Sequence, residues 1–183
     1  MKHSFLYKIL TILFLVSVSF SCASDLDFDQ VNDVKLEPVY VTNLAYFDVP
    51  ANDFVTGGTE QTLTFDQQTV DLFNDEFFKD NLVKTEFFFE FNNTINRAYA
   101  IDIILFNAND APLYTMHFDV PAYTGAENLV TRTEVFEGAK LDLLKSTVKM
   151  AFVLRLLPGP ALSESSLGSI KLRSGLTAYL VVE

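Results

Sequence analysis

The sequence predicts an all-β fold, an antiparallel two-sheet β-sandwich of about eight or nine strands with one or two short helical connections. Apolar and polar residues alternate in repeated short runs, and the runs are separated by turn residues such as Asn, Asp, Gly and Pro. Seven of the 18 phenylalanines fall between residues 73 and 91, which supplies bulk for a core between two sheets. We expect an immunoglobulin-like or C2-like sandwich, with a closed barrel as the alternative.

The expected strands follow from this alternation, because successive side chains of a strand point to opposite faces of a sheet. Phe87, Phe89 and Phe91 share one face and Phe88 points to the other. The expected strands are residues 39–42, 44–49, 61–65, 85–91, 99–106, 113–120, 128–136, 148–156, 170–173 and 176–182. Short polar turns predict that the strands 85–91, 99–106 and 113–120 form a meander. Gly175 predicts a bulge or bend.

Two segments have helical rather than alternating patterns. In residues 70–82, apolar residues recur at three- and four-residue spacing. Residues 140–147 place Leu141 and Leu144 on one face over about two turns. Both segments are expected to be short connections that cap the sheets.

The first 21 residues predict a secretory signal peptide. Lys2, His3 and Lys8 form a basic start, and residues 9–20 follow without a charge. This run is too short to span a bilayer, which needs about 20 apolar residues, but it suits the apolar part of a signal peptide. Cys22 comes directly after it and is the only cysteine of the chain.

The residues around Cys22 carry a resemblance to a known class of protein. Ser19, Phe20 and Ser21 precede Cys22 as in a relaxed lipobox, with Ser19 where Leu is common, and the acidic stretch of residues 23–29 follows. This arrangement resembles Bacteroidetes-type outer-membrane lipoproteins. The resemblance implies that Cys22 is lipidated and attaches the protein to the outer membrane, exposed at the surface or facing the periplasm. It also implies that Asp25, Asp27 and Asp29 act as an export signal.

Charge and composition set further limits. The chain has a formal net charge of −11, and without the leader's two lysines 11 basic and 24 acidic residues remain, a net charge of −13. Such a chain lacks the basic surface that a nucleic-acid partner needs. We expect an acidic tether over residues 22–35 and one sandwich domain over residues 36–183. The acidic run is no calcium loop, because Gln30 replaces the turn glycine and Leu36 the bidentate glutamate.

Catalytic motifs are missing from the sequence. His117 is the only histidine after the leader, so a catalytic triad would depend on it. No phosphate-binding loop, nucleophile elbow or zinc-ligand spacing is present. Glu86 and Glu90 share a strand face but lie about 13 Å apart, beyond the roughly 5–9.5 Å of glycosidase carboxylate pairs. The sequence therefore predicts no enzyme, no cofactor and no metal site.

Two non-catalytic functions remain, with a hydrolase as a third hypothesis. The first is a structural or protein-interaction module that contacts other envelope proteins through a sheet face or an edge strand. The alternative is a surface accessory protein that binds glycans through exposed aromatic rings. The expected outward or loop positions for such a patch are Phe88, Phe106, Tyr123 and Tyr179.

Overall fold

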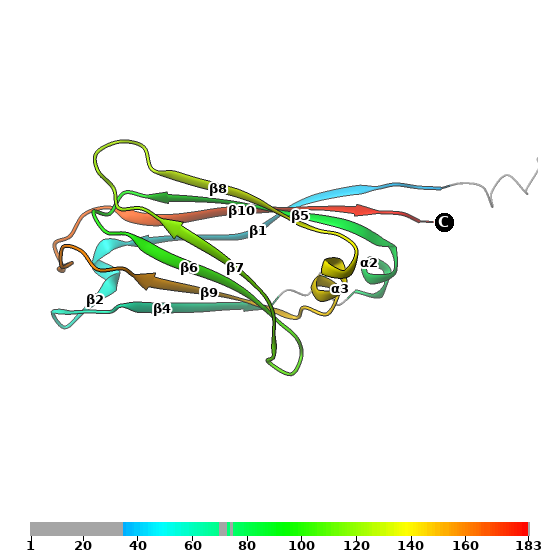
Figure 1. Ribbon diagram of the computed structural model, residues 1–183, viewed down its shortest axis with the longest axis horizontal. Coiled ribbons are helices and arrows are strands. Elements are labelled where there is room, and N and C mark those ends of the chain that lie inside the picture. Colours follow the sequence, from blue (N-terminus) through cyan, green and yellow to red (C-terminus); the bar gives the residue numbers. More distant parts are fainter. Residues whose placement is uncertain (1–34, 70–72, 74, 183) are drawn as a thin grey trace, which may run out of the picture. The chain divides into compact units, whose positions relative to one another are not determined.

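Two four-stranded antiparallel sheets face each other across an apolar core in the computed structural model, which describes residues 35–69, 73 and 75–182 (Figure 1). Residues Leu36–Val182 make one compact unit. The predicted signal peptide, Cys22 and the acidic residues Asp25, Asp27 and Asp29 lie outside the described residues. The two-sheet sandwich is confirmed, and because the sheets stay separate, the closed barrel is not the fold.

The first sheet has the order β1-β10-β5-β8, and the second sheet has the order β4-β9-β6-β7. The strands of the first sheet are β1 (Val39–Pro50), β10 (Ser169–Leu180), β5 (Leu82–Asn93) and β8 (Leu129–Phe136). Those of the second sheet are β4 (Leu63–Thr69), β9 (Lys149–Leu156), β6 (Tyr99–Phe106) and β7 (Pro112–Val120). A small hairpin of β2 (Val55–Thr56) and β3 (Thr59–Glu60) follows the 3-10 helix η2 (Ala51–Phe54).

This strand order defines a jelly roll. Within the two four-stranded sheets, β6 and β7 are the paired strands that follow each other along the chain, and outward from them β5 pairs with β8, β4 with β9 and β1 with β10. Such nested antiparallel pairs, spread over two four-stranded sheets, are the jelly-roll arrangement of eight strands. An immunoglobulin domain instead divides its strands as ABED and CFG. The sequence leaves the strand order open, and the observed order identifies the confirmed sandwich as a jelly roll.

The expected meander of β5, β6 and β7 is wrong, because β5 lies in the other sheet. The side chain of Asn93 explains the crossover. Its Nδ2 donates to Arg97 O at 2.7 Å and to Pro121 O at 2.8 Å, and its Oδ1 accepts from Ile95 N at 2.9 Å. These buried bonds fold residues 94–98 over the end of the sandwich. The turn was predicted correctly, but it joins two sheets and does not close a hairpin.

Aromatic side chains fill the space between the sheets, and the alternation predicted for residues 85–91 is confirmed. Phe87, Phe89 and Phe91 are fully buried. The rings of Phe89 and Phe91 pack against Phe118 of the second sheet, with centroids 5.4 and 4.9 Å apart. Each fully buried ring contributes about 1.5–3 kcal/mol relative to an exposed one, so core packing explains how the fold holds without a disulfide.

The first strand contains a bulge that the sequence did not reveal. Leu44 and Ala45 together face Ser174 of β10, because Asn43 pairs with Gly175 and Tyr46 with Arg173. Gly175 itself lies in regular register opposite Phe88, so the bulge or bend expected at Gly175 is wrong. The irregularity sits on the neighbouring strand.

Two short helices lie at one end of the sandwich (Figure 1). Helix α2 (Glu76–Asn81) starts at Asp75, whose side chain accepts a hydrogen bond from Phe78 N. The helix expected over residues 70–82 is confirmed at its C-terminal end within one residue, but it is shorter than predicted, because Asp75 before it has an extended backbone. Residues 70–72 and 74 lie outside the described residues. Helix α3 (Ala139–Lys145) confirms the second prediction within two residues at each end.

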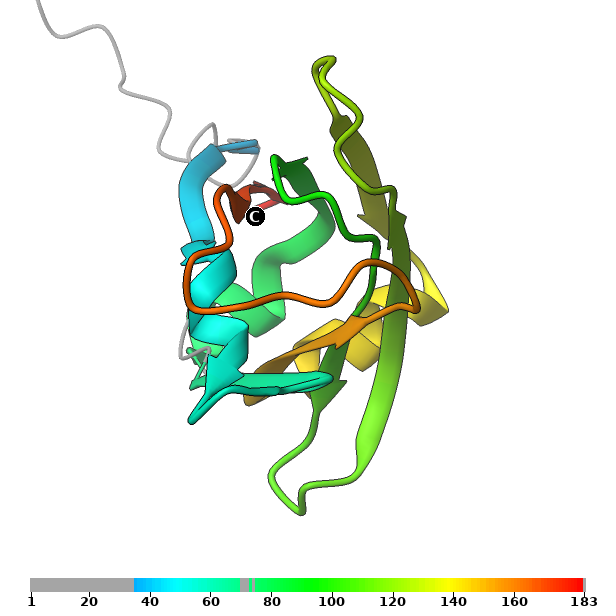
Figure 2. The same ribbon diagram turned by 90° about the vertical axis from the view of Figure 1, so that its left-hand side faces the viewer.

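The opposite end carries the connections before β4, β6, β8 and β10, and Figure 2 looks onto it. There Arg97, which is 5% exposed, pairs with both carboxylate oxygens of Glu60 at 3.0 and 3.1 Å. It also donates to the backbone oxygens of Leu157 and Pro160. One buried guanidinium thus ties together three connections that are far apart in the sequence.

Candidate binding site

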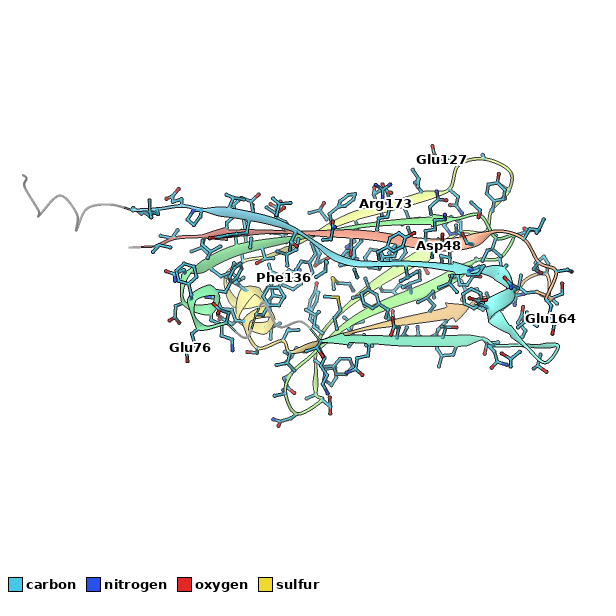
Figure 3. The ribbon with its side chains drawn as sticks, turned by 180° about the vertical axis from the view of Figure 1, so that it is seen from behind. Asp48, Glu76, Glu127, Phe136, Glu164 and Arg173 are labelled. Atoms are coloured by element: carbon cyan, nitrogen blue, oxygen red, sulfur yellow. The ribbon has the colours of Figure 1, made fainter. Side chains whose placement is uncertain are left out.

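The outer face of the first sheet presents an ordered grid of side chains to solvent. Strand register places residues of β1, β10, β5 and β8 side by side in rows. From the loop end inward the rows are Asp48, Lys171, Asn92 and Leu129; Tyr46, Arg173, Glu90 and Thr131; Asn43, Gly175, Phe88 and Thr133; and Val41, Thr177, Glu86 and Val135. The second and third of these are called the central rows below. Figure 3 shows Arg173 projecting from this sheet.

The bulge in β1 determines which side chains join the grid. Unbroken alternation from Tyr40, whose ring packs against buried Phe78, would turn Tyr46 inward. The extra residue reverses the alternation, so Tyr46 is 64% exposed and Phe47 takes the inner position. Bulges of this kind commonly re-aim a side chain next to a functional site.

Ser174 supports the bulge from inside the sandwich. Its hydroxyl accepts a hydrogen bond from Ala45 N and donates one to Ala45 O, both at 2.8 Å. A bulge interrupts the regular ladder and leaves backbone groups without partners. A single buried side chain satisfies both of those groups and holds the backbone that directs the Tyr46 side chain to solvent.

An open groove lies over the central rows, beside the bulge. One hollow of about 550 Å³ is lined by Asn43, Leu44, Ala45, Tyr46, Arg173 and Ser174. An adjoining hollow of about 220 Å³ shares Asn43, Arg173 and Ser174 and adds Phe88, Glu90 and Gly175. Gly175 has no positive φ, and a Cβ there would meet only Thr42 O, at 3.6 Å. Backbone conformation therefore does not require glycine at this position, and its missing side chain leaves the floor of the groove open.

Most charges on this outer face lie in ion pairs. The four rows hold the cations Lys171 and Arg173 and the anions Asp48, Glu86 and Glu90, and Lys84 in the next row pairs with Glu86 at 2.6 Å. Asp48 pairs with Lys171 at 2.9 Å, and Arg173 pairs with Glu90 at 3.4 Å. The hydrogen bond from Lys171 lowers the pKa of Asp48 and raises that of Lys171. The charges of the central rows thus cancel, in a chain whose net charge is −11.

The structure does not bring the four predicted aromatic residues together. Phe88 is 44% exposed in the groove, and Tyr179 lies four residues from Gly175 on the same face, where Lys84 covers its ring at 4.6 Å. Phe106 ends β6 in the second sheet, and Tyr123 lies in the connection from β7 to β8. Sequence reasoning missed Tyr46, whose exposure depends on the bulge.

His117 lies on the outer face of the second sheet, in a network of charged side chains. Its Nδ1 is 2.6 Å from Asp102 Oδ1 and its Nε2 is 3.2 Å from Asp119 Oδ1. Arg155 binds the other oxygen of Asp102, which is only 8% exposed. The contact with Asp102 raises the pKa of His117. Burial alone would raise the pKa of Asp102, but hydrogen bonds from His117 and Arg155 lower it.

This arrangement favours the imidazolium, which donates from both ring nitrogens to the two carboxylates. A general base needs a free nitrogen within reach of a substrate proton, and both nitrogens here face carboxylate oxygens. Among residues 35–69, 73 and 75–182, no group of three or more His, Cys, Asp or Glu side chains is arranged to hold a metal ion. In the same residues, no helix is long and apolar enough to cross a membrane.

Comparison with known proteins gives structural matches only. No protein-family model matches the chain, and no curated protein matches its sequence. The VP2 subviral particle of infectious bursal disease virus matches with a TM-score of 0.45 and 14% identity, over 78% of this chain and 32% of that chain. A protein of Parabacteroides distasonis, described as a predicted secreted protein, matches with a TM-score of 0.44 and 14% identity, over 63% of this chain and 37% of that chain. Desmodium yellow mottle tymovirus matches with a TM-score of 0.35 and 8% identity, over 81% of this chain and 90% of that chain. The chain spans about a third of the length of the first two proteins.

Proposed function

We propose that this protein is a non-catalytic binding module of the cell envelope, and that the outer face of the first sheet is its binding surface. The observation that carries the proposal is the groove over the central rows, flanked by the exposed rings of Tyr46 and Phe88. A concave surface that combines aromatic side chains with a few polar groups is typical of a binding site. The partner class that we propose at this level is another component of the envelope.

The same proposal includes a lipid anchor at Cys22, with Asp25, Asp27 and Asp29 as export signal, and a location at the surface of the outer membrane. It is supported by the leader pattern of residues 1–21 and by the lipobox-like residues that precede Cys22.

The anchor is tested with a Cys22→Ala variant and a palmitate analogue fed to growing cells. We expect the wild type to incorporate the analogue, to fractionate with the outer membrane and to be cleaved by protease added to intact cells. Cys22→Ala should incorporate none of it and should leave the membrane fraction. An unlabelled wild type, or a Cys22→Ala variant that remains in the membrane, would show that the lipoprotein proposal is wrong.

The binding surface is tested with two matched threonines. Thr133 and Thr115 are exposed strand residues on the outer faces of the first and second sheets. We expect Thr133→Arg to lose the envelope components that co-purify with the wild type after detergent solubilisation, whereas Thr115→Arg should retain them. Equal retention by both variants would refute the assignment of the surface.

A further inference from the structure

The composition of the central rows differs from that of the flanking rows. Aliphatic side chains on this outer face lie in the flanking rows, at Val41, Val135 and Leu129. The central rows hold two aromatic rings, two threonines, an amide, an ion pair and a glycine. The central rows therefore combine aromatic rings with hydrogen-bonding groups and hold no aliphatic side chain. This combination suits a hydroxyl-rich ligand better than an aliphatic one.

The groove also has the size and openness for a small chain-like ligand. Its larger hollow of about 550 Å³ falls within the roughly 300–1,000 Å³ of small-molecule sites. Tyr46 and Phe88 lie two strands and one row apart, which corresponds to roughly 12 Å between their backbones. Gly175 lies between them and keeps the floor clear. A ligand that spans this distance is longer than a single sugar unit.

Charge decides which kind of ligand fits. Arg173 and Glu90 neutralise each other at the centre of the groove, with 3.4 Å between their atoms. An anionic ligand would meet Glu90 and the field of an acidic chain, and a cationic ligand would have to displace Arg173 from its partner. A neutral ligand disturbs neither, and planar polar groups such as the Asn43 amide and the Arg173 guanidinium offer donors for its hydroxyl groups.

From these observations we propose that the groove binds a neutral oligosaccharide, with sugar rings stacked on Tyr46 and Phe88 across the floor at Gly175. The apolar face of a sugar ring packs on an aromatic face, and its edge carries the hydroxyl groups that Asn43, Arg173 and Glu90 would bind. This inference rests on the proposed function, in which the same sheet face is the binding surface, and it names the ligand class.

The test measures retardation of the purified protein in native gels that contain one polysaccharide each. The probes are the neutral polysaccharides starch, xylan, glucomannan and mixed-linkage β-glucan, with polygalacturonate as the anionic comparison. We expect at least one neutral polysaccharide to retard the wild type and polygalacturonate to have no effect. Phe88→Ala should weaken that binding at least tenfold, because it removes a stacking surface at the centre of the site.

Gly175→Thr provides the sharper variant. The backbone at Gly175 accepts a side chain, and a β-branched residue suits a strand, so the urea midpoint should stay equal or rise. The new side chain occupies the floor of the groove, so binding should be lost. Leu129→Ala is the control, since Leu129 is exposed on the same sheet face but outside the groove, and it should bind like the wild type.

Each outcome is decisive. Retardation that Gly175→Thr retains, retardation by polygalacturonate alone, or no retardation by any neutral probe would overturn the oligosaccharide proposal. If every neutral probe fails while Thr133→Arg still loses a co-purifying envelope component, the ligand class is wrong and the binding surface stands. If Thr133→Arg also behaves like the wild type, the binding surface itself is wrong.

Discussion

Removal of one hydroxyl group should reveal how much of the first sheet depends on the bulge in β1. Ser174 Oγ makes two buried hydrogen bonds of 2.8 Å, one to each backbone polar atom of Ala45. In Ser174→Ala, both atoms lose their partner within the sandwich. An unsatisfied buried polar group costs about 1–3 kcal/mol, and relaxation recovers a part, so we expect a loss of about 3 kcal/mol. Domains of this size have only about 5–15 kcal/mol of stability.

Equilibrium unfolding in urea measures this loss. With a denaturant dependence of about 2 kcal/mol per molar urea, the midpoint of Ser174→Ala should fall by roughly 1.5 M. Ser165→Ala is the control, because Ser165 is exposed in a loop, and it should change the midpoint very little. A loss below about 0.5 kcal/mol for Ser174→Ala would refute the reasoning, since the two backbone groups would then have other partners.

A second variant separates the effect of the bulge on stability from the effect of the Ser174 hydroxyl. Deletion of Leu44 leaves one residue opposite Ser174 and so restores regular pairing between the flanking positions. Ala45 then either joins the ladder or points its polar groups to solvent at the free edge of β1. In this background Ser174→Ala should cost much less than in the wild type, and the difference is the coupling between bulge and hydroxyl. Equal costs in both backgrounds would contradict the proposed role of Ser174.

Three further predictions concern other parts of the fold. Phe87→Ala should destabilise the domain by about 3–5 kcal/mol in urea, because it empties a fully buried position of the core. Arg97→Ala should cost about 2–4 kcal/mol by the same assay, because it leaves the Glu60 carboxylate and the backbone oxygens of Leu157 and Pro160 without their partner. The pKa of His117 is raised by Asp102, so the stabilisation from this pair is complete below pH about 6.5 and is lost as the pH rises through the folded-state pKa. Since the imidazole is half exposed, this loss should stay within about 1 kcal/mol, and His117→Asn should abolish it in unfolding curves recorded between pH 6 and 9.

Local pattern predicted which side chains are buried, because the alternation of a strand depends on its own residues. Phe87, Phe89 and Phe91 face the core as predicted, and Phe88 faces solvent. Pairing between strands depends on remote residues. Asn93 looks like the start of a hairpin turn, yet its side chain binds Pro121 O, 28 residues away, and so directs the chain to the second sheet. Such a contact leaves no signal near Asn93 in the sequence.

The candidate site shows more clearly that local sequence pattern does not reveal the effect of remote residues. Phe88 could be predicted because its strand alternates without a break. Tyr46 could not, because its direction depends on a hydroxyl group 129 residues away from Ala45. Phe106 and Tyr123 could be placed on outward or loop positions, but pattern alone does not state which sheet a position belongs to, and the topology separates both from Phe88.

Ser174 and Gly175 are neighbours on β10 that face opposite sides of the first sheet, and together they join the fold to the groove. Ser174 faces inward and holds the bulge that turns Tyr46 to solvent, whereas Gly175 faces outward and leaves the floor open. If the groove were only an incidental gap between side chains, substitutions at Ser174 and Gly175 would have no reason to affect stability and ligand binding differently. If the bulge forms the groove, Ser174→Ala should weaken both stability and binding, because the backbone next to Tyr46 is no longer held in place. Gly175→Thr should then weaken binding alone.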